Sequence, residues 1–111
     1  MTDDLLRAVR EKTATFAYVL AHIQTHYEYS PTAFRNGNSA NSAGQNEGAC
    51  RVFAYAQLVG LSENDTLLCF AEHYASVLAS PSGSDHANIR AFMDSGWAGI
   101  AFDTPALSAK T

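Results

Sequence analysis

The stretch RNGNSANSAGQNEG, residues 35–48, separates the apolar parts of the chain and decides which fold is expected. It contains three glycines and four of the six asparagines of the chain: Asn36, Asn38, Asn41 and Asn46. Nothing in this stretch can line an apolar core, so we predict a long polar loop. Loops of this length are uncommon in a small domain, and they are usually functional or disordered. Because asparagine and glycine both suit tight turns, we predict that this loop is ordered.

Apolar residues recur at helical spacing on both sides of the loop. The predicted helices cover residues 3–12, 14–27, 49–60, 62–79 and 84–95. About five helices joined by short turns predict an all-α fold, and residues 1–111 are expected to form a single domain. A small α+β fold is the alternative, if residues 97–102 pair with residues near 32–35. The predicted core consists of Phe16, Leu20, Ile23, Phe53, Leu58, Leu68, Phe70, Phe92 and Met93.

The composition is that of a folded, soluble and mildly acidic protein. Hydrophobic residues make up 47%, and 7 Lys+Arg against 11 Asp+Glu give a net charge of -4. This balance argues against a nucleic-acid partner, which usually requires a basic patch. No apolar run approaches the roughly 20 residues of a membrane span, so no membrane partner is expected. The amino terminus lacks the apolar stretch of a signal peptide.

Two helix starts carry residues that could catalyse a reaction. Cys50 follows the loop in the first turn of a predicted helix, where free N–H groups and the helix dipole stabilise a thiolate. His86 stands beside Asp85 at a later helix start and could act as a general base. Cys50 and His86 are therefore the candidate catalytic pair of a small Cys/His hydrolase. Buried, inert thiols are the expected state of both Cys50 and Cys69, and whether the protein is an enzyme stays open.

Gln45, Cys50 and the Asp-His-Ala sequence at 85–87 resemble the pattern of papain-like cysteine proteases. The chain is much shorter than members of that family. Its sequence also does not predict the strands that normally carry the histidine in that family. This resemblance covers only a few residues.

The same two segments also suit binding without catalysis. We expect the loop at 36–48 and the turn at 84–90 to form one surface. The side-chain amides of the loop both donate and accept hydrogen bonds, which suits a peptide or a small polar ligand. The expected partner of this surface is an unidentified protein or a small polar ligand, and two converging helix amino termini would favour an anionic or carbonyl-bearing one. The candidate binding residues are Asn36, Asn41, Gln45, Asn46, Asp85, Asn88 and Arg90. A third possibility is an interaction protein that uses an apolar face on residues 3–20.

No metal site and no cofactor are predicted. His22 and His26 lie four residues apart, as two ligands on one helix face would, but the glutamate of an H-E-x-x-H motif is missing. The glycine-rich loop has no G-K-[ST] sequence, and no G-x-G-x-x-G motif follows a strand.

Six segments spread over the chain point to one known family. They are FRNG (34–37), NSAGQN (41–46), GACRVFAYAQL (48–58), LLCF (67–70), DHANIRAFM (85–93) and GWAGIAF (96–102). Together they resemble the HopJ type III effector family over nearly the full length. The resemblance implies a bacterial protein of undefined biochemical activity, in the cytoplasm or exported through a type III system. Such export signals tend to be poor in acidic residues, whereas Asp3, Asp4 and Glu11 stand near the amino terminus. This favours the cytoplasm.

Overall fold

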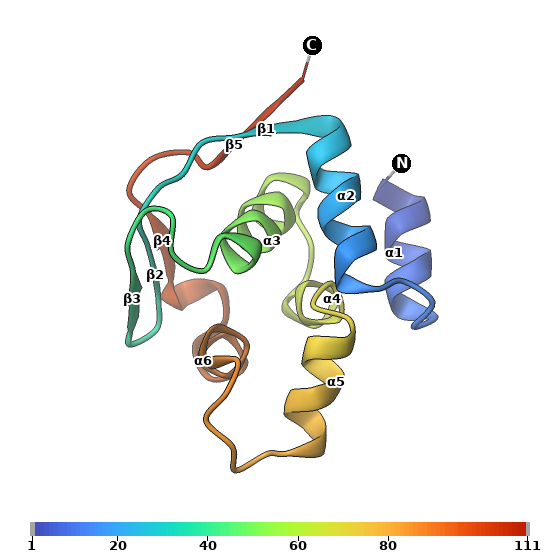
Figure 1. The fold of residues 1–111 in the computed structure, drawn as a ribbon, viewed down its shortest axis with the longest axis vertical. Helices are drawn as coiled ribbons and strands as arrows, with labels where there is room; N and C mark the ends of the chain where they lie inside the picture. The colour runs from blue at the N-terminus through green and yellow to red at the C-terminus, as the bar shows by residue number, and fades with distance from the viewer. Residues whose placement is uncertain (1, 111) are drawn as a thin grey trace.

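The structure, a computed structural model, describes residues 2–110 and has an α+β fold (Figure 1). Its helices are α1 (Thr2–Arg10), α2 (Phe16–His26), α3 (Glu47–Val59), α4 (Glu63–Leu68), α5 (Glu72–Ala79) and α6 (Ala87–Ser95), followed by a 3₁₀ turn (Gly96–Gly99). Its strands are β1 (Tyr27–Tyr29), β2 (Phe34–Asn36), β3 (Ser39–Asn41), β4 (Ile100–Phe102) and β5 (Leu107–Ala109). The prediction of an all-α fold is therefore wrong, because the strands form two small antiparallel sheets.

The stretch predicted to be one long loop begins with a β-hairpin. Strands β2 and β3 pair antiparallel with Asn36 opposite Ser39, so that Gly37 and Asn38 form the turn. Gly37 has a φ of 60°, a conformation that short hairpin turns require and that glycine adopts without steric cost. The Gly-Asn pair at 37–38 is a known two-residue hairpin signal. The prediction missed it because the flanking residues are polar, whereas strands are usually rich in β-branched and aromatic residues.

Strand β4 completes the three-stranded sheet by pairing with β2 on the side opposite β3. Phe34 lies opposite Phe102, and Asn36 lies opposite Ile100. This is the pairing that the alternative α+β prediction required. Strands β1 and β5 form the second sheet, in which Tyr29 lies opposite Leu107.

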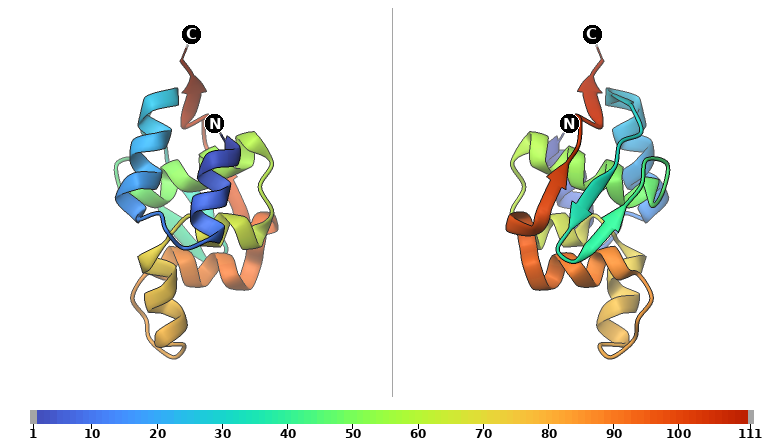
Figure 2. Two further views of the ribbon diagram at one scale, coloured as in Figure 1. Left: turned by 90° about the vertical axis from the view of Figure 1, so that its right-hand side faces the viewer. Right: turned by 90° about the vertical axis from the view of Figure 1, so that its left-hand side faces the viewer.

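Helix α3 lies at the centre of the molecule, and its sequence explains why. Residues 52–56, Val-Phe-Ala-Tyr-Ala, are all buried. A helix that is apolar on all sides must be covered on all sides. The three-stranded sheet lies on one side of α3, and α1 and α2 lie on the other (Figures 1 and 2). The ring of Phe53 packs 6.3 Å from that of Phe34, 5.3 Å from that of Phe70 and 5.0 Å from that of Phe92, measured between centroids.

Most of the predicted core is in place, with two exceptions. Ile23, Phe53, Phe70 and Phe92 are buried, and Phe16, Leu20 and Leu68 pack against the core while partly exposed. Leu58 and Met93 are 58% and 44% exposed, so their assignment to the core was wrong. Both lie on helices whose opposite faces already fill the interior.

The helix predicted over 62–79 is two helices. Ser62 caps α4 as expected, because its side chain accepts the main-chain N–H of Asp65. The break comes at Ala71, which precedes α5 and has φ 52° and ψ -122°. No glycine or proline marks this position, so the break depends on packing rather than on a local signal.

Helix length also bears on membrane association. The longest described helix, α3, has 13 residues, whereas a membrane span needs about 20. None of the helices formed by residues 2–110 combines the length and apolar character that crossing a bilayer requires.

Candidate functional site

Three buried asparagines connect the hairpin to α6. The Nδ2 of Asn36 donates to the main-chain carbonyl of Asn88 at 2.8 Å and to its Oδ1 at 3.0 Å. The Nδ2 of Asn88 donates to the Oδ1 of Asn41 at 3.1 Å. The expectation that the 36–48 stretch lies against the 84–90 turn is therefore confirmed. These amides are engaged within the fold, and all three residues are buried, so they position the two segments relative to each other.

Gln45 and Asn46 shape the segment between β3 and α3. The Nδ2 of Asn46 donates to the Oδ1 of Asn41 at 2.6 Å, which extends the asparagine network to the start of α3. The Oε1 of Gln45 accepts the main-chain N–H of Ser42 at 3.0 Å. Asn46 then takes a left-handed conformation, φ 53° and ψ 47°, directly before α3. Both residues thus direct the first turn of α3.

Asp85 and Arg90 close the loop that precedes α6. The guanidinium of Arg90 donates to the Asp85 carboxylate at 2.6 Å and to the Asp85 main-chain carbonyl at 2.5 Å. It also donates to the main-chain carbonyls of Ser80 at 3.0 Å and Pro81 at 3.3 Å. The hydrogen bond from Arg90 lowers the pKa of Asp85. Arg90 therefore holds this loop, and its charge is compensated by Asp85.

The amino termini of α3 and α6 meet at one pocket of about 350 Å³. Asn46, Gly48 and Ala49 line it from α3, and residues 86–89 line it from α6. Asn46 and His86 precede the two helices in left-handed conformations, and within the described chain no side chain caps either helix. The free N–H groups of both first turns and the positive ends of both helix dipoles are therefore placed at this pocket.

Aromatic rings and two imidazoles form the remaining wall. Phe16 stacks on Phe70 at 5.8 Å, and the ring of His73 meets Phe16 at 4.8 Å. The rings of His73 and His86 lie 5.0 Å apart. Gly48 permits the close approach of Phe16, because a Cβ there would lie 3.1 Å from its ring. Sequence reasoning missed Phe16 and His73 as site residues, since no local motif marks them and only packing brings them to the pocket.

Cys50 lies in surroundings different from those of His86. It is buried, and it is not among the residues that line the pocket with His86. Burial raises the pKa of the Cys50 thiol, while a hydrogen bond with Tyr29 acts in the opposite direction. The hydroxyl of Tyr29 donates to the carboxylate of Glu47 at 2.9 Å, and the guanidinium of Arg51 lies 4.3 Å from the centre of the Tyr29 ring. The Cys50/His86 hydrolase stays a prediction, and the reactivity of the thiol is its test.

His22 and His26 form a second pair of imidazoles, with ring centroids 4.7 Å apart on α2. Burial lowers the pKa of His22, and the charge of His26 acts in the same direction. Within residues 2–110, no group of three or more His, Cys, Asp or Glu side chains is arranged to hold a metal ion. We assign no metal site to this pair.

Comparison with known proteins reveals relatives over the whole chain. The sequence model of the family described as HopJ type III effector protein matches residues 2–107. The crystal structure of VPA0580, described as a protein of unknown function, is 41% identical and superimposes with a TM-score of 0.93, covering 99% of this chain and 94% of that one. No curated protein matches the sequence. The chain belongs to the HopJ type III effector family.

Proposed function

We propose that this protein is a binding module for a small ligand with an anionic or carbonyl-bearing end, held in the pocket between α3 and α6. The observation that carries the proposal is the convergence of two helix amino termini, neither of them capped by a described side chain. Free N–H donors and the positive ends of helix dipoles stabilise negative charge. A carbonyl oxygen accepts from the same donors.

The walls of the pocket favour a flat, apolar body behind the polar end. The stacked rings of Phe16 and Phe70 provide an apolar surface. The imidazoles of His73 and His86 can each donate a ring N–H to a ligand oxygen, and each adds positive charge when protonated. An aromatic carboxylate has both features.

Two nearby carboxylates are engaged by other groups. Glu47, in the first turn of α3, accepts the hydroxyl of Tyr29 at 2.9 Å and does not line the pocket. Asp85 lies 3.8 Å from the Nε2 of His86, but it is paired with Arg90 at 2.6 Å. Arg90 compensates the charge of Asp85, and neither Glu47 nor Asp85 is among the residues that line the pocket.

Titration with benzoate, benzamide and benzylammonium tests this proposal. We expect benzoate to shift the amide resonances of Gly48, Ala49 and Ala87, and to bind at least about tenfold more tightly than benzylammonium. The affinity for benzamide shows how much of the binding a neutral carbonyl provides without the negative charge. If benzylammonium binds as tightly as benzoate, or if these amides do not shift, the proposed site is wrong.

Variants at the pocket sharpen the test. Ala49→Glu places a carboxylate at the end of the first turn of α3, and Ala49→Gln provides a side chain of the same size without charge. We expect the Glu variant to bind benzoate much more weakly than the Gln variant. His86→Asn suits the left-handed conformation at this position and should weaken benzoate binding, whereas His26→Asn, outside the pocket, should not.

We also propose, from family membership, export through a type III system as a second function to be tested. The match over residues 2–107 supports it. A translocation reporter fused to the carboxyl end of the full chain should give signal in a bacterium with a working type III system, and none in a matched strain without the secretion ATPase. Equal signals in the two strains would contradict export by this route.

A further inference from the structure

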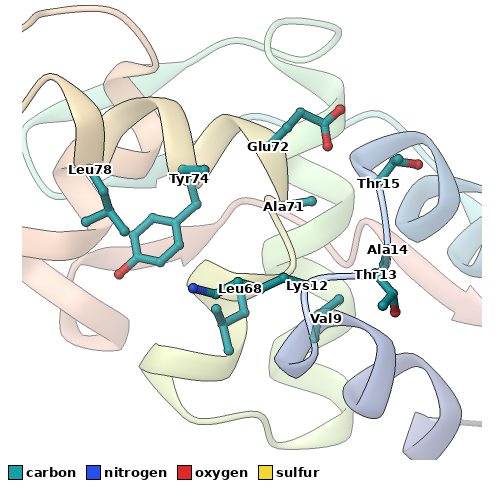
Figure 3. Close-up of a pocket in the computed structure, with 11 residues that line it drawn as sticks. Val9, Lys12, Thr13, Ala14, Thr15, Leu68, Ala71, Glu72, Tyr74 and Leu78 are labelled. Atoms are coloured by element: carbon teal, nitrogen blue, oxygen red, sulfur yellow. The ribbon is translucent and has the colours of Figure 1, made fainter.

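A second pocket, of about 370 Å³, lies between the end of α1, α4 and α5 (Figure 3). Its volume falls within the range of small-molecule sites. We propose that it binds a small aliphatic carboxylate, whose hydrocarbon chain contacts the apolar lining and whose carboxylate pairs with Lys12. This site is separate from the pocket between α3 and α6, although both border the first turn of α5, where Glu72 lines one pocket and His73 the other.

The apolar lining follows from the spacing of residues on α5. Ala71 lies directly before α5. Positions 74, 75 and 78 share one side of the helix, because 78 is four residues after 74 and three after 75. This side borders the pocket, while Val77, directed elsewhere, is buried in the core. Leu78 is 52% exposed. Val9 of α1 and Leu68 of α4 line the pocket across from α5 (Figure 3). A hydrocarbon chain in the pocket would remove this apolar surface from water.

The charges at the pocket favour an anionic ligand. Of the described residues that line it, Lys12 alone carries a positive charge. The one carboxylate, that of Glu72, accepts the main-chain N–H of Phe16 at 2.8 Å, and this hydrogen bond lowers its pKa. In Figure 3 the side chain of Lys12 extends toward Leu68 and Tyr74, whereas Glu72 points away from them. A ligand carboxylate at Lys12 is therefore held apart from Glu72.

The backbone around this pocket supports the same conclusion. Lys12 and Ala71 both line it, with φ values of 61° and 52°. Such conformations are unfavourable for residues other than glycine, and they cluster where ligands bind. Among residues 2–110, the other two non-glycine residues with positive φ are Asn46 and His86, which line the pocket between α3 and α6.

Calorimetric titration of the full chain with octanoate, octanol and octylammonium tests this inference. We expect saturable binding of octanoate at one site. Octanol and octylammonium should bind at least about tenfold more weakly, because neither can form the charge-assisted hydrogen bond between Lys12 and a carboxylate. Lys12→Met keeps the length of the side chain and removes its charge. It should reduce octanoate affinity to that of octanol and leave octanol binding unchanged.

A second pair of variants tests the location. Ala75→Trp fills the pocket from an exposed position on α5, and Ala79→Trp places the same side chain one turn later, outside the lining. Octanoate binding should be lost in Ala75→Trp and retained within about twofold in Ala79→Trp. Circular dichroism verifies folding, and unchanged benzoate shifts at Gly48 and Ala87 separate this site from the proposed one. Equal octanoate binding by the two variants, tight octylammonium binding, or no saturable octanoate binding by the wild-type protein would each overturn the inference.

Discussion

Asn36 and Asn88 are 52 residues apart in sequence, yet the Nδ2 of Asn36 donates to both the main-chain and the side-chain oxygen of Asn88, at 2.8 Å and 3.0 Å. The contact joins β2 to the first turn of α6 and so helps to position the pocket between α3 and α6. The Oδ1 of Asn36 is buried without a hydrogen-bond partner among the described residues. Because an unpaired buried acceptor is costly, the contact stabilises the fold by less than its two bonds suggest.

Asn36→Ala should lower the free energy of unfolding by about 1–3 kcal/mol, because both oxygens of Asn88 lose a donor in the interior. Gln57→Ala removes an amide from an exposed position on α3 and should change stability by less than about 0.5 kcal/mol. Urea unfolding followed by circular dichroism measures both values. Equal stabilities of the two variants would contradict a structural role for the Asn36–Asn88 contact.

Phe53 and Leu58 lie on the same helix but differ in burial. Phe53 is fully buried among three other phenylalanine rings, whereas Leu58 is 58% exposed. Phe53→Ala should therefore cost about 3–5 kcal/mol of stability. Leu58→Ala should cost less than about 1 kcal/mol. The difference between their urea midpoints measures this contrast, and a large loss in Leu58→Ala would show that the exposed end of α3 is covered in solution.

Gly96 and Gly60 both have positive φ, but a side chain at Gly96 would also have to displace the carboxylate of Glu63, which accepts the main-chain N–H of Trp97. Gly96 has φ 60° and ψ -154°, and a Cβ there would collide with the carboxylate of Glu63. Gly60 lies in the left-handed region with no atom within 4 Å of such a Cβ. Gly60→Ala should cost about 1 kcal/mol, and Gly96→Ala should cost about 2–3 kcal/mol or more. Thermal unfolding compares the two, and the reverse order would show that the loop at Gly96 rearranges freely.

Both thiols should react slowly in the native protein at neutral pH. Burial raises the pKa of Cys50, and burial raises the pKa of Cys69 to about 12. Since the thiolate is the reactive form, alkylation by iodoacetamide should be far slower than in the urea-unfolded chain and should accelerate as the pH rises. Mass spectrometry of the two cysteine peptides gives each rate separately. A Cys50 rate at pH 7 equal to that of the unfolded chain would instead favour the Cys50/His86 hydrolase.

The ion pair between Arg10 and Asp65 should make stability depend on acidic pH. The guanidinium donates to the two carboxylate oxygens at 3.0 Å and 2.7 Å, and this hydrogen bonding lowers the pKa of Asp65. A carboxyl whose pKa is lower in the folded state stabilises the protein above its unfolded pKa, about 3.9, and this contribution is lost as the pH falls through the folded value. Asp65→Asn should therefore melt a few degrees below the wild type at pH 7. The two melting curves should coincide near pH 2, and a constant difference across this range would contradict the assignment.

The sequence alone determined where most helices lie. The stripe that includes Val19 and Ile23 predicts α2, and the nearly continuous apolar run after Cys50 predicts α3, because helical periodicity is a property of neighbouring residues. Gly96 ends α6 as expected. The sequence also predicted that the polar stretch lies against the turn before α6, since two sets of polar residues outside any helical pattern have few other places to be satisfied.

Only the tertiary structure decided the sheets and the composition of the pocket. Two of the three residues of β2, Arg35 and Asn36, are polar. The segment becomes a strand because β3 and β4 supply hydrogen-bond partners on both edges, one of them more than sixty residues away. The break at Ala71 and the meeting of Phe16 with His73 likewise depend on packing between distant elements. Local propensity acts over a few residues, whereas strand pairing and burial depend on groups that only the folded chain brings together.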